Sequence, residues 1–118
     1  MRREYMPPDW RCNPYRYREL VNFARQYEFL KKKKNEINLN MRAANKTKKS
    51  AELIKIEKKL ELIDTTVTEA CGEKQYLRDV IFTAVTEDIP IYMINTELSD
   101  RTVARYKRQF YFLLDKKI

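Results

Sequence analysis

The sequence predicts an all-α fold, and three observations lead to this prediction. The 118 residues include one glycine and four prolines, too few for the many tight turns of a β-sandwich or barrel. Apolar residues recur at spacings of three and four along several long stretches, as they do on one face of an amphipathic helix. The length suits one domain, and a hydrophobic share of 43% suffices for a modest core. We therefore expect a single domain, with a long helical hairpin followed by a three-helix unit that ends in a C-terminal helix-turn-helix.

The N-terminal part should begin with an arm over residues 1–12, because its Pro-Pro pair forbids a helix. A first long helix is expected over residues 13–35. Asn13 can accept backbone N–H bonds at the start of this helix, and Pro14 suits its first turn. Its apolar face is predicted from residues at 3-4-3 spacing, which are Tyr17, Leu20, Ala24 and Tyr27.

A polar, asparagine-rich stretch over residues 36–49 is predicted to form a basic loop. A second long helix should follow over residues 50–71, with Ser50 as its N-cap and Gly72 as its stop signal. Its apolar seam can pack against the first helix or against a second copy of the chain. The seam that would form this homodimer consists of Leu53, Ile56, Leu60, Ile63 and Val67.

The helix-turn-helix unit is expected over residues 73–118. A helix from about residue 73 to residue 85 should come first, and a short helix through Pro90 should follow; a β-strand is the alternative that this proline disfavours. After a turn, Ser99 can cap the final helix, with Asp100 in its first turn. The buried stripe of this helix is predicted to be Val103, Tyr106, Phe110, Leu113 and Leu114.

The composition argues against most enzyme classes. The chain has no histidine, which excludes Ser-His and Cys-His nucleophile pairs and histidine-containing zinc sites. A single glycine leaves no Gly-rich phosphate loop. We therefore expect no enzyme activity, no metal and no cofactor. One carboxylate cluster, Glu57, Glu61 and Asp64, shares a helical face and either holds a metal or pairs with neighbouring lysines.

No membrane contact is expected, because no apolar run approaches the roughly 20 residues that span a bilayer. The N-terminus lacks the apolar stretch of a signal peptide, which predicts a cytoplasmic location. Cys12 and Cys71 should then be reduced thiols.

Positive charge is concentrated at the two ends of the chain. Residues 1–50 hold 14 basic and 5 acidic residues, a net charge of +9. Residues 51–87 hold 5 basic and 8 acidic residues, a net charge of −3, and residues 88–118 hold 6 and 4, a net charge of +2. An acidic middle between basic ends is typical of a protein whose ends contact a polyanion.

The final helix carries the most specific signal. Arg101, Arg105 and Arg108, at positions i, i+4 and i+7, lie opposite its predicted apolar stripe. A recognition helix of this kind docks in the major groove of duplex DNA, where arginine pairs with guanine. Residues near the helix start, Arg101, Thr102 and Arg105, are expected to contact base edges. Lys107 and Arg108 are expected to contact phosphates. The alternative is that the arginines form only a solvated face.

Other basic and aromatic residues are less specific. Lys46, Lys48 and Lys49, together with Arg42 and the lysine run at residues 31–34, either clamp phosphate without sequence preference or keep the surface soluble. Three tyrosines could stack on single-stranded bases, although their helical spacing favours core packing. They are Tyr15, Tyr17 and Tyr27.

Residues 98–110, Leu-Ser-Asp-Arg-Thr-Val-Ala-Arg-Tyr-Lys-Arg-Gln-Phe, resemble the C-terminal signature of RinA/ArpU-like phage transcription regulators. The shared features are the Ser-x-Arg-Thr start, the aromatic and basic residues that follow, and the final Phe110. The segment around Tyr17 and Tyr27 is also similar to phage-borne proteins of Gram-positive bacteria. The resemblance implies a fold similar to the sigma-factor region that reads the −35 promoter element. It also implies sequence-specific control of late phage genes in the cytoplasm of a bacterial host cell, with host RNA polymerase as a partner.

The function expected from these observations is sequence-specific binding of duplex DNA by a phage-type transcriptional regulator. One alternative is a small terminase subunit for DNA packaging, which also joins a helix-turn-helix to oligomerising helices. A second alternative is a small phage interaction or inhibitor protein, whose basic surface occupies an acidic or nucleic-acid site on a host protein.

Overall fold

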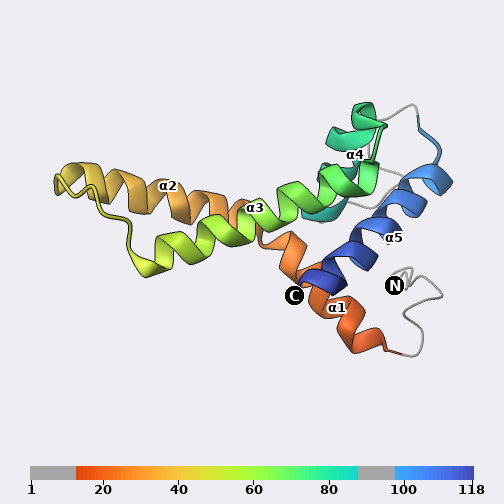
Figure 1. The fold of residues 1–118 in the computed structure, drawn as a ribbon, viewed down its shortest axis with the longest axis horizontal. Helices are drawn as coiled ribbons and strands as arrows, with labels where there is room; N and C mark the ends of the chain where they lie inside the picture. The colour runs from red at the N-terminus through yellow and green to blue at the C-terminus, as the bar shows by residue number, and fades with distance from the viewer. Residues whose placement is uncertain (1–12, 88–97) are drawn as a thin grey trace.

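The computed structural model describes residues 13–87 and 98–118, and the regular elements in these two ranges are all helical. The predicted all-α fold is confirmed, and the first helices form the expected hairpin (Figure 1). In chain order the elements are α1 (Pro14–Arg25), α2 (Tyr27–Ala43), α3 (Ala51–Cys71), a 3₁₀ helix (Gln75–Leu77), α4 (Arg78–Thr86) and α5 (Asp100–Lys117).

The second half of α3 forms the body of the molecule together with α1, α4 and α5. Helix α5 contacts the other three, so its inner side is covered from three directions. Tyr17 of α1 meets Tyr111 of α5 edge to face, with ring centroids 5.4 Å apart. Side chains that are at most 1% exposed come from all four helices and include Leu20, Ile63, Val67, Ile81, Val85, Val103, Phe110 and Leu114.

Helix α2 and the first half of α3 project from the body as a helical hairpin, which we call the arm (Figure 1). The arm has a small core of its own, formed by Leu30, Ile56 and Leu60 with Tyr27 and Ile37 packed beside it. Its projection makes the molecule elongated, with extents of 49 × 32 × 32 Å.

The predicted first helix over residues 13–35 is two helices that meet at Gln26. The Gln26 N–H donates to the carbonyl of Phe23 at 3.3 Å, so one turn is tightened to an i to i−3 bond. The ribbon bends at this point (Figure 1). The bend lets α1 pack in the body while α2 continues along the arm.

The predicted basic loop over residues 36–49 is wrong in its first half. Helix α2 continues to Ala43, and the loop covers only residues 44–50. Asparagine costs a helix less than 1 kcal/mol per residue, a weak preference that packing readily overrides. Ile37 packs against the core of the arm and is partly buried. This contact with α3 outweighs the local cost of the asparagines.

The predicted caps are confirmed at all three sites. The side chains of Asn13, Ser50 and Ser99 each accept a backbone N–H bond at 3.2 Å from the residue three positions later. Gly72 ends α3 with φ +58°, a value that residues with a Cβ rarely adopt. The next helix starts as the 3₁₀ turn and ends at Thr86, close to the prediction of residues 73–85.

The seam of α3 is covered within one chain. Leu53, Ile56, Leu60, Ile63 and Val67 are each at most 7% exposed. Their partners are α2 on the arm and the other helices in the body. Because these side chains are already buried, the expected homodimer through the same five residues has no exposed surface in this fold. The intramolecular alternative for the seam holds instead.

Several predictions lie outside the described residues. They are the N-terminal arm over residues 1–12, the short helix or strand around Pro90, and most of the helix-turn-helix turn at residues 95–98. The flanking helices α4 and α5 are described, and they pack against each other. Across the described ranges, no helix is both long and apolar enough to cross a membrane.

Candidate nucleic-acid interface

The outer side of α5 presents a continuous basic surface. Val103, Phe110, Tyr111 and Leu114 are buried against the body, which turns the opposite side of the helix outward. The exposed residues on that side step along four turns, and we call them the arginine face: Arg101, Arg105, Arg108, Phe112 and Lys116. Sequence analysis had missed Phe112 and Lys116, although both continue the i, i+4, i+7 series of the arginines.

Aromatic rings hold two of these cations in place. The guanidinium carbon of Arg105 lies 5.2 Å from the ring centroid of Tyr106. The Nη2 of Arg105 also donates to the Tyr106 hydroxyl at 3.5 Å. The Lys116 ammonium lies 4.3 Å from the ring centroid of Phe112. Cation–π contacts of this kind restrict the side chains without neutralising their charge. The positive groups therefore remain able to meet an anion.

Two of the predicted contact residues do not share this surface. Thr102 is half-buried, and its hydroxyl oxygen lies 2.9 Å from that of Ser99 in the helix cap. Lys107 is also half-buried, since two residues correspond to about 200° of helical rotation from Arg105. Lys107 therefore lies outside the arginine face, and its expected contact with phosphate stays a prediction.

Polar contacts fix the C-terminal end of α5 to the body. The Arg16 Nε donates to Asp115 Oδ1 at 2.6 Å, and its Nη2 donates to the backbone carbonyl of Ile118 at 2.7 Å. The Lys117 ammonium donates to Glu69 at 2.9 Å and to the Thr66 hydroxyl at 3.1 Å. Helix α5 is therefore held to both α1 and α3, and the arginine face has a defined orientation relative to the body.

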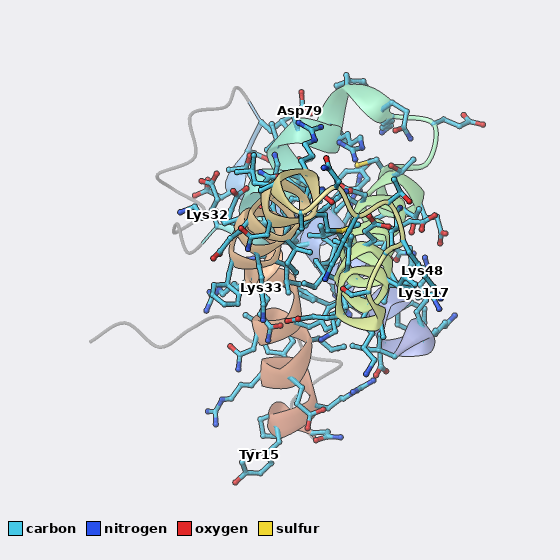
Figure 2. All side chains as sticks on the ribbon, turned by 90° about the vertical axis from the view of Figure 1, so that its left-hand side faces the viewer. Tyr15, Lys32, Lys33, Lys48, Asp79 and Lys117 are labelled. Carbon is cyan, nitrogen blue, oxygen red and sulfur yellow. The ribbon has the colours of Figure 1, made fainter. Side chains whose placement is uncertain are left out.

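The predicted lysines of the loop lie at the end of the arm. Lys46 and Lys48 are exposed there, and Figure 2 looks onto that end of the molecule, with Lys48 on its flank. The Lys49 ammonium instead forms an ion pair with Glu57 at 2.9 Å. The end of the arm and the first turn of α5 lie at opposite ends of the long axis (Figure 1). The fold therefore separates the two predicted basic sites.

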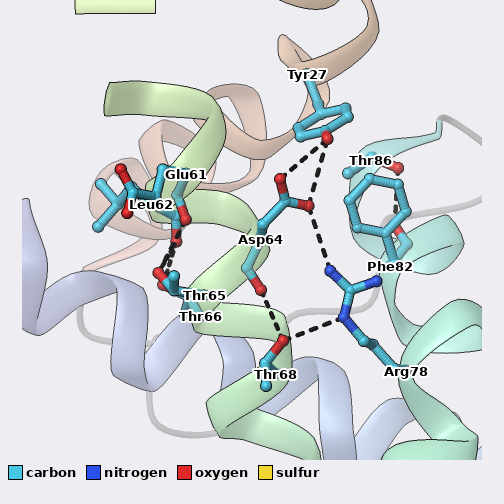
Figure 3. A network of polar contacts seen from close by, with 10 residues as sticks. All are labelled: Tyr27, Glu61, Leu62, Asp64, Thr65, Thr66, Thr68, Arg78, Phe82 and Thr86. Carbon is cyan, nitrogen blue, oxygen red and sulfur yellow. Dashed lines mark hydrogen bonds and ion pairs between the residues drawn. The ribbon is translucent and has the colours of Figure 1, made fainter. Parts of the chain in front are cut away.

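A polar network joins the arm to the body (Figure 3). The Tyr27 hydroxyl donates to both carboxylate oxygens of Asp64, at 3.1 and 3.3 Å. Arg78 approaches the same carboxylate at 3.4 Å and donates to the Thr68 hydroxyl at 3.1 Å. The Tyr27 ring also meets Phe82 edge to face, with centroids 4.7 Å apart. These contacts fix the direction in which the arm leaves the body.

The structure decides between two pairs of alternatives that the sequence left open, one for the acidic cluster of α3 and one for the tyrosines. Asp64 bonds to Tyr27 and Arg78, Glu57 pairs with Lys49, and no cluster suited to a metal occurs among the described residues. Pairing is therefore the better interpretation for Glu57 and Asp64, and the partner of Asp64 is an arginine rather than a lysine. Tyr17 is buried and Tyr27 is partly buried against the core, as the core-packing alternative expects. That alternative is wrong for Tyr15, which is 74% exposed.

The thiol of Cys71 lies in the core of the body at the end of α3. Burial raises its pKa above the ordinary value, because a thiolate would lose its hydration there. This thiol is accordingly a packing group.

Replacing Tyr27 by Phe is expected to change how stability depends on alkaline pH. The pKa of Tyr27 is raised above its ordinary value of 10.0, first by burial and then by the negative charge and hydrogen bond of Asp64. The folded state thus favours the neutral phenol. The stability that this group contributes is present below pH 10.0 and is lost as the pH rises through the raised folded-state pKa.

Urea unfolding at about pH 8 and about pH 11 can measure this difference. The wild-type protein should lose more stability between the two values than Tyr27→Phe does. Lysines and other tyrosines titrate in the same range in both proteins, so only the difference between them reports on Tyr27. Equal losses would contradict the assignment.

The chain was also compared with known proteins. No family model, no curated protein and no solved structure matches it.

Proposed function

We propose that this chain binds duplex DNA and that the arginine face of α5 enters the major groove. The observation that supports this proposal is the exposure of Arg101, Arg105 and Arg108 along one side of a helix whose other side is buried. The major groove admits one α-helix, and arginine can donate two hydrogen bonds to the O6 and N7 atoms of guanine. A helix already held by its packing loses little further freedom when it binds.

The proposed role is that of a phage-type transcriptional regulator. The resemblance of residues 98–110 to the RinA/ArpU-like signature supports this role, and the residues that carry it include Ser99, Arg101 and Phe110. They form the cap, the outer face and the buried anchor of α5. A regulator of this kind would act on a promoter-like site together with host RNA polymerase. A terminase subunit or an inhibitor of a host protein remains the alternative.

The triple variant Arg101→Ala/Arg105→Ala/Arg108→Ala is expected to bind duplex DNA about a hundredfold or more weakly than the wild-type protein. Each bidentate arginine–guanine pair contributes roughly 1–3 kcal/mol, and the variant removes two such residues together with the phosphate contact of Arg108. A matched control, Lys55→Ala/Lys58→Ala/Lys59→Ala, removes three exposed positive charges from α3. Fluorescence anisotropy at fixed salt concentration measures both affinities. Equal weakening in the two variants would contradict a specific role of α5.

Sequence preference separates a regulator from the alternatives. A duplex selected from a random DNA pool should bind the wild-type protein more tightly than a scrambled duplex does. Arg105→Ala should reduce that ratio by roughly 5- to 150-fold, because base-edge contacts carry the preference. A wild-type protein that binds all duplexes equally would rule out sequence-specific regulation, and one that binds none would favour a protein partner.

A further inference from the structure

The loop at the end of the arm is an ordered turn with a defined geometry. The Lys46 N–H donates to the carbonyl of Met41 at 2.9 Å, and the Asn45 N–H donates to the carbonyl of Arg42 at 3.2 Å. This pair of bonds is a Schellman motif, and Asn45 supplies the left-handed residue that it needs, with φ 53°. Asparagine tolerates this conformation better than most residues. The motif fixes where the chain goes after α2, and so where Lys46 is presented.

The end of the arm carries positive charge that the described part of the protein does not neutralise. Residues 37–51 contain four basic residues and no acidic one. Arg42, Lys46 and Lys48 are exposed and form no ion pair with any described residue. We call these three residues the basic tip.

Two lysines elsewhere on the arm differ from the tip, because they have acidic partners. Lys33 pairs with Glu52 at 2.8 Å, and Lys49 pairs with Glu57 at 2.9 Å. An open groove of about 480 Å³ between α2 and α3 is lined by both signs of charge, with three lysines facing three carboxylates: Lys31, Lys34, Lys49, Glu57, Glu61 and Asp64. These pairs and the groove place part of the arm's positive charge against carboxylates, whereas residues 37–51 around the basic tip supply no carboxylate.

The helix dipoles of α2 and α3 do not account for all of the positive charge at the basic tip either. Arg42 lies in the last turn of α2, where the helix dipole favours a cation. Lys48, however, lies just before Ser50, the N-cap of α3. The N-terminus of a helix has a partial positive charge, so a cation beside it is unfavourable. A bound anion at this position would remove the repulsion.

We propose that the basic tip is a second DNA-binding surface, which contacts the phosphate backbone without regard to base sequence. This inference rests on the proposed function, since it takes duplex DNA as the polyanion. Lysine and arginine contacts to phosphate position a protein on DNA but do not read sequence. The arginine face then supplies the preference for a site, and the tip supplies affinity that depends on salt.

The position of the tip determines what it can reach. It lies at the end of the long axis away from the first turn of α5, and that axis measures 49 Å (Figure 1). At 3.4 Å per base pair, this length corresponds to about 14 base pairs. The phosphates that the tip contacts therefore belong either to a distant flank of the duplex bound by α5 or to a second duplex.

The variant Arg42→Gln/Lys46→Gln/Lys48→Gln tests the proposal in the full chain, with Lys55→Gln/Lys58→Gln/Lys59→Gln as a control of equal charge on the same arm. Anisotropy titrations with a scrambled duplex of 30 base pairs, repeated over a range of salt concentrations, give the slope of log K against log salt. Each lost phosphate contact lowers the magnitude of this slope by about 0.9. We expect a decrease of roughly 2–3 for the tip variant and no comparable decrease for the control. A slope equal to that of the control would overturn the proposal.

Titrations with shorter duplexes distinguish phosphates on a flank of the same duplex from phosphates on a second duplex. If the tip contacts a flank, the difference between tip variant and wild type should disappear below about 14 base pairs. If it contacts a second duplex, the difference should persist, and two differently labelled short duplexes should show energy transfer with the wild-type protein alone. Either result supports the proposal, whereas no difference at any length overturns it. If the tip variant binds normally while the α5 triple variant does not, the inference about the tip fails and the proposed function stands.

Discussion

Replacing Phe110 by Ala is expected to lower the free energy of unfolding by about 3–5 kcal/mol. The Phe110 side chain is fully buried in the core between α5 and the rest of the body, and its ring centroid lies 5.1 Å from that of Tyr111. Its removal leaves a cavity and deletes an aromatic contact at the same time. A domain of this size is typically stable by only about 5–15 kcal/mol, so the loss is a large part of the total.

Urea denaturation followed by circular dichroism measures this effect, and Phe112→Ala is the matched control. Phe112 lies on the same helix two residues later, but it is 46% exposed. Its replacement should cost less than about 1 kcal/mol, as is usual for substitutions away from the core. Similar losses for the two variants would contradict the orientation of α5 and, with it, the position of the arginine face.

Replacing Leu60 by Ala is expected to open the arm while the body stays folded. Leu60 is only 7% exposed and packs with Leu30 and Ile56 in the small core between α2 and α3. Truncating a buried leucine costs about 2–5 kcal/mol, and here we expect the lower part of that range because the cluster is small. The body has its own larger core, so the arm can open as a separate unit.

Native-state hydrogen exchange measured by mass spectrometry can follow the two parts separately. Amides of α2 and of the first half of α3 should exchange roughly 30- to 150-fold faster in Leu60→Ala, and those of α5 should change little. Ile54→Ala is the control, because Ile54 lies on the same helix and is 41% exposed. Faster exchange throughout the chain would instead indicate that arm and body unfold as one unit. Loss of the arm should also remove the contribution of the basic tip to DNA binding.

Local signals in the sequence were sufficient for the ends of most helices. Asn13, Ser50 and Ser99 were expected as N-caps from their side-chain chemistry, and each accepts the expected bond. Gly72 ends α3 because a stop of this kind needs a positive φ. These features depend on residues within one turn of each other, so no knowledge of the rest of the fold is required.

The C-terminal end of α2 was missed because its stability comes from outside the segment. The stretch over residues 36–49 is polar and rich in asparagine, which suggested a loop. Two signals could have corrected this expectation: Ile37 lies seven residues after Leu30 on the same face, and Asn45 is a good left-handed stop. The packing of α2 against α3 then decides in favour of a helix.

The buried side of α5 was broader than its periodicity indicated. The predicted stripe included Tyr106 and Leu113, which are only partly buried, and omitted Tyr111, which is 2% exposed. Tyr111 is covered because α1 packs beside it through Tyr17. A helix that meets three neighbours buries more of its circumference than a helix that meets one, and the sequence of the helix alone does not state how many neighbours it has.

The amino-acid sequence by itself determined the helical class, the caps and the exposure of Arg101, Arg105 and Arg108. These follow from periodicity and side-chain chemistry along one stretch of chain. Only the tertiary structure decided that the seam of α3 is buried within the chain and that the basic tip lies at the opposite end of the molecule from the first turn of α5, where the arginine face begins. The physical reason is that an apolar seam attracts any complementary apolar surface, whereas its actual partner and the direction of the arm depend on packing between distant segments and on the contacts of Tyr27 and Asp64.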